Sequence, residues 1–268
     1  MTILKTAFEL IPLKTENIDH KNFIQIAFSV FSKKLFLDND KVDYTLRRRF
    51  LNKFAYFILN SKTEEIESYL KPFLDNFKPT RNTADFFEEF VSVEDRLGHY
   101  EEFWQVWNIF YEKIVLICQI KSAYSLHYVK GIIHNYLLAW SFWRVDAREW
   151  HSLKEREKAF YKKVAEDIGS HPSVLYSIVK VLNDIGSNFI EDGIIWLSNI
   201  LQKNSQLISD ELETNTIYYI ENLIRKYVLI NRHKIKTSRQ IKIHVIVILN
   251  FLVERGSITG YLLREDIL

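Results

Sequence analysis

Apolar side chains recur at alternating steps of three and four residues along almost the entire chain, and this spacing limits the fold more than any other feature. The most regular stripe consists of Phe103, Trp107, Phe110, Ile114 and Ile117. Such steps place side chains on one face of an α-helix, whereas a half-buried strand would repeat every second residue. No segment alternates convincingly at the period of a strand. The sequence therefore predicts an all-α protein.

One short run keeps a strand as an alternative. The run from Ile241 to Ile248 is rich in β-branched side chains, and these are common in strands. Because the run lies inside a longer helical stripe, we expect a helix there as well.

Two segments have a predicted buried face. The stretch from Leu126 to Trp150 is the one around which the rest of the chain is expected to pack, because it is apolar on more than one side of a helix. Its main stripe consists of Val129, Ile133, Tyr136, Trp140, Trp143 and Ala147. In the first helical segment, from Asp19 to Phe36, the side chains expected to face the core are Phe23, Ala27, Val30 and Phe31.

Turn residues, prolines and glycines divide the chain into about twelve helical segments with short connections, and Gly98 and Gly256 are expected to follow helix ends. If successive helices pair as hairpins, a new pair begins about every 44 residues, which is in the range of HEAT or armadillo repeats. We therefore predict an irregular α-solenoid of helical hairpins (HEAT/armadillo-like) in a single domain over residues 1–268. A compact helical bundle is the alternative.

Composition supports a folded helical protein and excludes several classes. Only 7 Gly and 4 Pro occur among 268 residues, while 47% of the residues are hydrophobic. These values exclude disordered and collagen-like chains. The formal net charge of +2 argues against a protein that is basic throughout and coats nucleic acid.

The cysteine content and the apolar runs predict a cytoplasmic protein. Cys118 has no second cysteine to pair with and lies in an apolar run that begins at Ile114, so we expect a buried structural thiol in a reducing compartment. Lys5 and Glu9 interrupt any apolar signal core. The longest apolar run, Ile243 to Val253, is about half the roughly twenty residues that a membrane-spanning helix needs. No membrane association is expected.

Motifs that carry chemistry are missing from the sequence. The phosphate-binding patterns G-x-x-x-x-G-K-[ST] and G-x-G-x-x-G do not occur, nor do G-x-S-x-G, H-E-x-x-H or C-x-x-C. His127 and His134 share a helix face but lie roughly 10 Å apart, too far for one metal ion. We therefore predict a protein that is not an enzyme and that has no cofactor and no metal. An enzyme whose site has no recognisable motif is a further hypothesis.

Charge is distributed unevenly along the chain. No acidic residue occurs between Asn222 and Val253, whereas the span from Asp85 to Glu102 contains seven acidic residues and one arginine. Within the basic segment 225–242, the candidate contacts for an anion or a nucleic acid are Arg225, Arg232, His233, Lys234, Lys236, Arg239 and Lys242. We expect a helix to end near Ile230 and a basic loop to follow, and such a loop can hold phosphates. Contact with a protein and a merely solvated helix end are the other two interpretations.

A second set of candidate residues lies in the aromatic helices. The candidates for binding a protein partner are Trp104, Trp143, Arg144, Arg148 and Trp150. Exposed aromatic side chains and arginines anchor many protein interfaces. The alternative for Arg144 and Arg148 is the ion-paired side of a mostly buried helix.

Four segments carry a resemblance to a known family: FLNKFAYFILN, FWQVWNIFYEKI, YLLAWSFWRVDAREWHSLKE and NFLVERGSITGYLLREDIL. Together they resemble the C-terminal helical-repeat region of large bacterial STAND-type ATPases, some of which act in antiviral defence. In that family the repeats sense a ligand, often a foreign protein, and a separate ATPase module drives oligomerisation. The resemblance implies the sensor part of a bacterial signalling or defence ATPase, with this sequence as a C-terminal fragment of a larger protein. It supplies no site residues.

These observations lead to two predicted functions. The first is a non-catalytic helical-repeat module for protein-protein interaction or ligand sensing, because stacked helices present an extended surface. The alternative is nucleic-acid binding through the basic segment 225–242.

Overall fold

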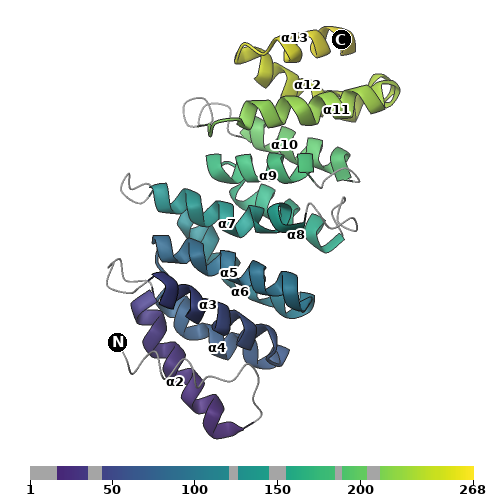
Figure 1. Cartoon of the computed structure of the whole chain (residues 1–268). Coiled ribbons are helices and arrows are strands. Elements are labelled where there is room, and N and C mark those ends of the chain that lie inside the picture. The colour runs from purple at the N-terminus through teal and green to yellow at the C-terminus, as the bar shows by residue number, and fades with distance from the viewer. Residues whose placement is uncertain (1–16, 36–43, 121–125, 145–154, 185–188, 204–211) are drawn as a thin grey trace. The chain divides into compact units, whose positions relative to one another are not determined.

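The computed structural model describes residues 17–35, 44–120, 126–144, 155–184, 189–203 and 212–268 (Figure 1). Within these ranges the chain forms twelve α-helices and no strand, which confirms the all-α prediction. The run from Ile241 to Ile248 lies inside a helix, α12 (Arg239–Glu254). The chain divides into two compact units, unit 1 (Met1–Ala139) and unit 2 (Trp140–Leu268).

Unit 1 contains the first five described helices and most of the sixth. These helices are α2 (Ile18–Leu35), α3 (Tyr44–Leu59), α4 (Thr63–Asp75), α5 (Arg81–Leu97), α6 (Tyr100–Cys118) and α7 (Leu126–Arg144). The main contacts join α2 to α4, α3 to α5 and α4 to α6, so each helix packs on the next but one along the chain. Helical hairpins stacked in two layers make this pattern of contacts.

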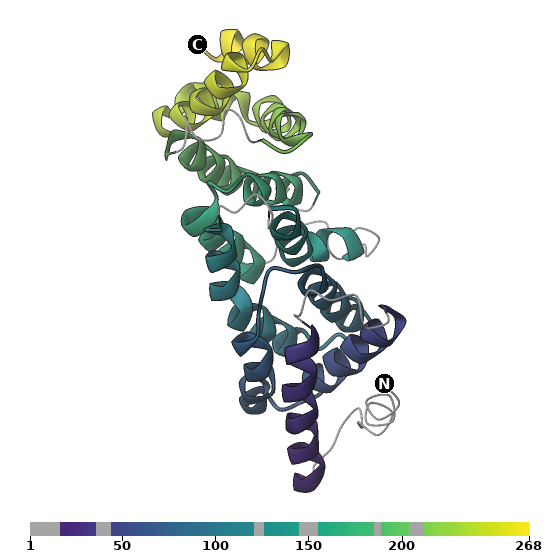
Figure 2. The same ribbon diagram turned by 90° about the vertical axis from the view of Figure 1, so that its left-hand side faces the viewer.

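Unit 2 repeats the same pattern of packing. Its helices are α8 (Glu155–Ile168), α9 (Pro172–Asp184), α10 (Ile190–Lys203), α11 (Thr216–Thr237), α12 and α13 (Ile258–Ile267). Contacts join α8 to α10, α9 to α11, α10 to α12 and α11 to α13, and Figure 2 shows the resulting two layers. Each unit is thus built as the hairpin prediction requires. A single continuous solenoid domain over residues 1–268 stays a prediction.

Aromatic side chains fill the core of unit 1. Phe54 packs against Phe28 edge to face, with ring centroids 4.6 Å apart, and against Phe73 with centroids 4.1 Å apart. Trp107 of α6 and Tyr136 of α7 form a reciprocal pair: the indole Nε1 donates to the carbonyl oxygen of Tyr136 at 3.0 Å, and the Tyr136 hydroxyl donates to the carbonyl oxygen of Trp107 at 2.7 Å. Burial of both rings therefore leaves neither polar atom without a hydrogen bond.

The predicted stripe of α7 is confirmed where its side chains are described. Val129, Ile133 and Tyr136 are fully buried. Trp140 and Trp143 lie in the helix, but their side chains are outside the described part of the structure, as is the whole of Ala147. The helical stripe thus predicted the buried face of α7 over the first three of its positions.

The predicted buried face of α2 is partly wrong, by a small rotation. Phe31 is buried as predicted and Ala27 is half-buried, but Phe23 and Val30, also expected inside, are exposed, and Ile24 and Phe28 are buried in their place. The helix carries two adjacent apolar stripes, and its main described contact is with α4. A single packing partner covers only one stripe, and the sequence alone does not show which stripe that is.

Candidate interaction surface on α11

The basic segment 225–242 covers the second half of α11 and the start of α12, and its Lys and Arg residues are exposed except Lys242, which is half-buried. The predicted helix end near Ile230 is confirmed to within a residue, because the helix breaks at a kink at Asn231; the predicted loop is wrong, because α11 resumes after the kink and continues to Thr237. Asn231 alone leaves helical geometry inside it, with φ −113° and ψ 19°. Ile235, beyond this kink, is fully buried. Its burial favours a helical turn over a solvated loop, because only the turn directs this side chain into the core.

One carboxylate holds the two parts of α11 together across the kink. Glu191 of α10 accepts hydrogen bonds at Oε2 from the Tyr227 hydroxyl at 3.0 Å and from the Lys234 ammonium at 2.6 Å. Tyr227 precedes the kink and Lys234 follows it. The pKa of Tyr227 is raised, first by burial and then by its hydrogen bond to Glu191, so the phenol stays a donor at neutral pH.

The basic segment contains seven Lys and Arg residues, Lys226 among them, and two of the seven are neutralised within the fold. Lys234 pairs with Glu191, and Arg232 pairs with Asp266 of α13. Glu191 and Asp266 lie 43 and 34 positions away from their basic partners in the sequence. The absence of acidic residues within the segment therefore does not reveal these two ion pairs. The sequence therefore overstates the positive charge of this segment.

The other five cations have no acidic partner among the described residues. Arg225 donates only to the amide oxygen of Asn222, at 3.2 Å. The Nζ atoms of two lysines donate to backbone carbonyl oxygens at 3.4 Å, Lys226 to Asn183 and Lys242 to Leu268. The remaining two are Lys236 and Arg239, which are exposed together with His233. This side of α11 and α12 is therefore positively charged.

Two exposed aliphatic side chains lie among these cations. Leu229 and Ile230 are 73% and 78% exposed, more than almost any other large apolar residue in the described ranges. Sequence reasoning missed them. Leu229 lies on the side of α11 opposite the buried Tyr227, whereas Ile230, seven residues after the buried Leu223, lies at the edge of the buried side. We call the exposed side of α11 the α11 surface, and define it by Arg225, Lys226, Leu229, Ile230, His233 and Lys236.

The predicted aromatic partner-binding residues do not form a described site. Trp104 is buried, with 3% of its surface exposed, and packs near Tyr100 and Phe103. It therefore lacks the exposed indole that this prediction requires. Trp143 and Arg144 lie in the last turn of α7, but their side chains are not among those described. Arg148 and Trp150 lie outside the described residues altogether.

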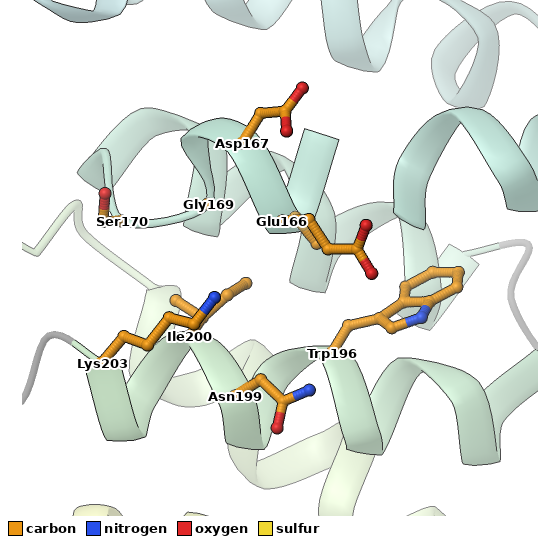
Figure 3. Close-up of a pocket in the computed structure, with 9 residues that line it drawn as sticks. Glu166, Asp167, Gly169, Ser170, Trp196, Asn199, Ile200 and Lys203 are labelled. Carbon is orange, nitrogen blue, oxygen red and sulfur yellow. The ribbon is translucent and has the colours of Figure 1, made fainter. Parts of the chain in front are cut away.

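A hollow of about 400 Å³ in unit 2 is the other candidate site (Figure 3). It lies where the end of α8 meets α10, and its lining consists of Ala165, Glu166, Asp167, Gly169, Ser170, Trp196, Asn199, Ile200 and Lys203. Figure 3 shows Glu166 directed toward Trp196, whereas Asp167 points away from Asn199. The charged groups do not converge on one point, as acid-base chemistry on a substrate requires.

Other sources of reactivity are also weak. In the part of the chain that the structure describes, no group of three or more His, Cys, Asp or Glu side chains could hold a metal ion. Cys118 is half-buried rather than fully buried as predicted, and desolvation raises the pKa of its thiol to about 12. Its thiol is thus protonated at neutral pH, whereas a nucleophilic cysteine needs a lowered pKa.

A scan against protein-family models gave no match, and a search of the curated proteins gave none either. None of the described helices is both long and apolar enough to cross a membrane. Neither of the two comparisons suggests a function, so a proposed function has to rest on the α11 surface.

Proposed function

We propose that this chain is a non-catalytic binding module that recognises a protein partner through the α11 surface. The observation that carries the proposal is the pair of bare aliphatic side chains, Leu229 and Ile230, among cations that have no acidic partner in the described residues. Protein interfaces bury apolar side chains at their centre and keep charged groups at their rim. The α11 surface has this arrangement.

Nucleic-acid binding through the basic segment 225–242 is the second candidate. Arg225, Lys236 and Arg239 are exposed cations that support it, since phosphate contacts supply most of the affinity for nucleic acids. Phosphates gain nothing from Leu229 and Ile230, however, and these residues lie among the cations of the segment. We therefore favour a protein partner.

The wider role in this proposal is that of a sensor. The resemblance of four segments to the helical-repeat region of STAND-type ATPases supports a cytoplasmic module that binds a foreign or cellular protein and passes the signal to an ATPase. The two-layered packing inside each unit supports the same role, because stacked helices offer long surfaces for recognition.

Photo-crosslinking tests the proposal directly. A photoreactive amino acid at His233, on the α11 surface, is expected to give a covalent adduct with a protein in cells. The same amino acid at Asn108, an exposed position on α6, is the matched control. Arg225→Glu with Lys236→Glu should abolish the adduct, whereas Arg49→Glu on α3 should leave it unchanged.

A contrary result would come from nucleic-acid binding. If His233 gives no protein adduct and the chain binds a DNA or RNA duplex, the second candidate replaces the first. In that case the affinity should fall steeply with salt, and the double reversal at Arg225 and Lys236 should make the salt dependence shallower.

A further inference from the structure

The helix next to α11 extends its exposed surface. The Ser257 hydroxyl, at the N-cap of α13, donates to a carboxylate oxygen of Glu221, and Arg232 pairs with Asp266 near the end of α13. The order of these links is the same along both helices, so α11 and α13 lie parallel, as neighbours in one layer (Figure 1). Both also pack on α12, and their solvent-facing sides therefore point the same way.

α13 leaves an apolar stripe open to solvent. Ile258 and Leu262 are 76% and 62% exposed, and Tyr261 between them is also exposed. The opposite side of the helix is packed: Ile267 is buried, and a Cβ at Gly260 would lie 2.6 Å from the Cβ of Leu252. The close approach at Gly260 fixes which side of α13 faces outward.

The register of the two helices brings the exposed apolar residues together. Glu221 is level with Ser257 and Arg232 with Asp266, so Lys226 is level with residues 261 and 262. Leu229, about one turn further along α11, therefore borders the same outer surface as Leu262. We call this surface the α11–α13 face, and define it by Leu229, Ile258, Tyr261 and Leu262, with Arg225 and Lys236 at its edges.

A second copy of the chain and a lipid surface both fit this face poorly. A symmetric dimer through it would place Arg225 and Lys236 of one copy near the same cations of the other, which is unfavourable. An anionic membrane would meet Glu265, an exposed carboxylate that pairs with Arg264 at 3.6 Å and continues the stripe one helical turn after Leu262. A helix of another protein can instead place a polar or basic group against Glu265.

We infer that the α11–α13 face binds an amphipathic α-helix of the protein partner. Its apolar stripe packs on Leu229, Ile258 and Leu262, and its Asp or Glu side chains pair with Arg225 and Lys236. Recognition of one helix by an apolar surface with charged edges uses side chains spaced at i, i+3, i+4 and i+7. The inference rests on the proposed function, and it adds α13 to the site and the chemistry of the partner.

A displayed library of random helical peptides of about 16 residues, selected on the full chain, tests this inference. The recovered peptides are expected to carry apolar residues at helical spacing with Asp or Glu beside them. One recovered peptide, measured by fluorescence anisotropy, should bind about tenfold or more weakly to Leu262→Glu. Leu116→Glu on α6, a similarly exposed leucine far along the sequence, should bind as the wild type does.

The charged residues at the edges of the face provide a second, independent test. Arg225→Glu with Lys236→Glu should weaken the acidic peptide by a similar factor and should bind a version of that peptide in which each Asp and Glu is replaced by Lys. Circular dichroism checks that each variant keeps its helical content. If Leu262→Glu lowers that content, Leu262→Ser takes its place.

The outcomes separate the two proposals. If the charge reversals weaken the peptide and both Leu262 variants leave it unchanged, α13 is not part of the site; the inference then fails while the proposed function stands. If no helical acidic peptide is recovered, or the chain instead binds phosphatidylserine vesicles or a DNA duplex in a Leu262-dependent way, the inference is overturned. The crosslink from His233 decides the proposed function separately.

Discussion

Glu89 joins α3 to α5 through two side chains of α3. Its carboxylate is buried and accepts from Arg48 Nε at 2.5 Å and from the Asn52 amide at 3.1 Å. The adjacent Glu88 also contacts Arg48, at 3.3 Å, but its side chain is 38% exposed. Glu88 and Glu89 are adjacent in the sequence and identical in type, but they differ in burial.

Replacing Glu89 should be far more harmful than replacing Glu88. Glu89→Ala leaves the Asn52 amide and part of the Arg48 guanidinium without an acceptor, so we expect a loss of about 2 kcal/mol in the free energy of unfolding. Glu88→Ala should lose less than about 1 kcal/mol, because an exposed ion pair contributes little. Urea unfolding of both variants measures the difference, and equal losses would contradict the structure.

Tyr227 should make stability depend on alkaline pH. Its pKa is raised in the folded chain by burial and by Glu191, so the phenolate forms more easily in the unfolded chain. Stability is then fully present below the ordinary tyrosine pKa of about 10 and declines above it, by up to about 1.4 kcal/mol per pH unit.

The variant Tyr227→Phe isolates this effect. It should lose about 1 kcal/mol at neutral pH, because the hydrogen bond to Glu191 is missing. Between about pH 10 and 11 its stability should fall less steeply than that of the wild type, as measured by chemical unfolding at each pH. Parallel pH curves for the two proteins would show that Tyr227 does not carry the dependence.

Among the elements, α11 differs most from its predicted form. Glycine marks other helix ends reliably: Gly98 and Gly256 follow α5 and α12 with φ of 68° and 77°, as predicted. In α11 the break at Asn231 was predicted, but the second helical stretch up to Thr237 was not, because it depends on Ile235, whose burial against other helices has no local signature. Helix ends set by backbone conformation were thus predictable, and the end set by tertiary packing was not.

Ile235 should control the second part of α11. Ile235→Ala removes a fully buried side chain, so we expect a loss of about 3 kcal/mol and faster hydrogen exchange at the amides of residues 232–237. Lys236→Ala, at the exposed neighbouring position, should leave exchange nearly unchanged. Equal exchange in the two variants would mean that packing of Ile235 does not hold this turn.

For the whole molecule, the sequence predicted helical class and hairpin stacking from periodicity, but it predicted the candidate site only in part. The seven cations of the basic segment were visible in the sequence, while the pairing of Arg232 with Asp266 and of Lys234 with Glu191 required the fold. The exposure of Leu229 on α11 and of Leu262 on α13 likewise depends on which faces the neighbouring helices cover.

Packing by near neighbours should keep damage local. Phe54 is fully buried in unit 1, and Phe54→Ala is expected to lose about 3–5 kcal/mol. Because each helix contacts only a few others along the chain, hydrogen exchange should rise most in α2 to α5 and least in α10 to α13. A uniform rise across all helices would indicate that the chain unfolds as one cooperative block.

The neutralisation of Arg232 and Lys234 leaves positive charge at two places on α11, around Arg225 and around Lys236. Eleven residues, or roughly three helical turns, separate these two positions, and the kink at Asn231 lies between them. A ligand with evenly repeated negative groups would place some of them over the aliphatic middle, where they find no counter-ion. If the α11 surface binds a protein as proposed, we expect it to discriminate by distance and to favour a binder whose acidic groups are three helical turns apart.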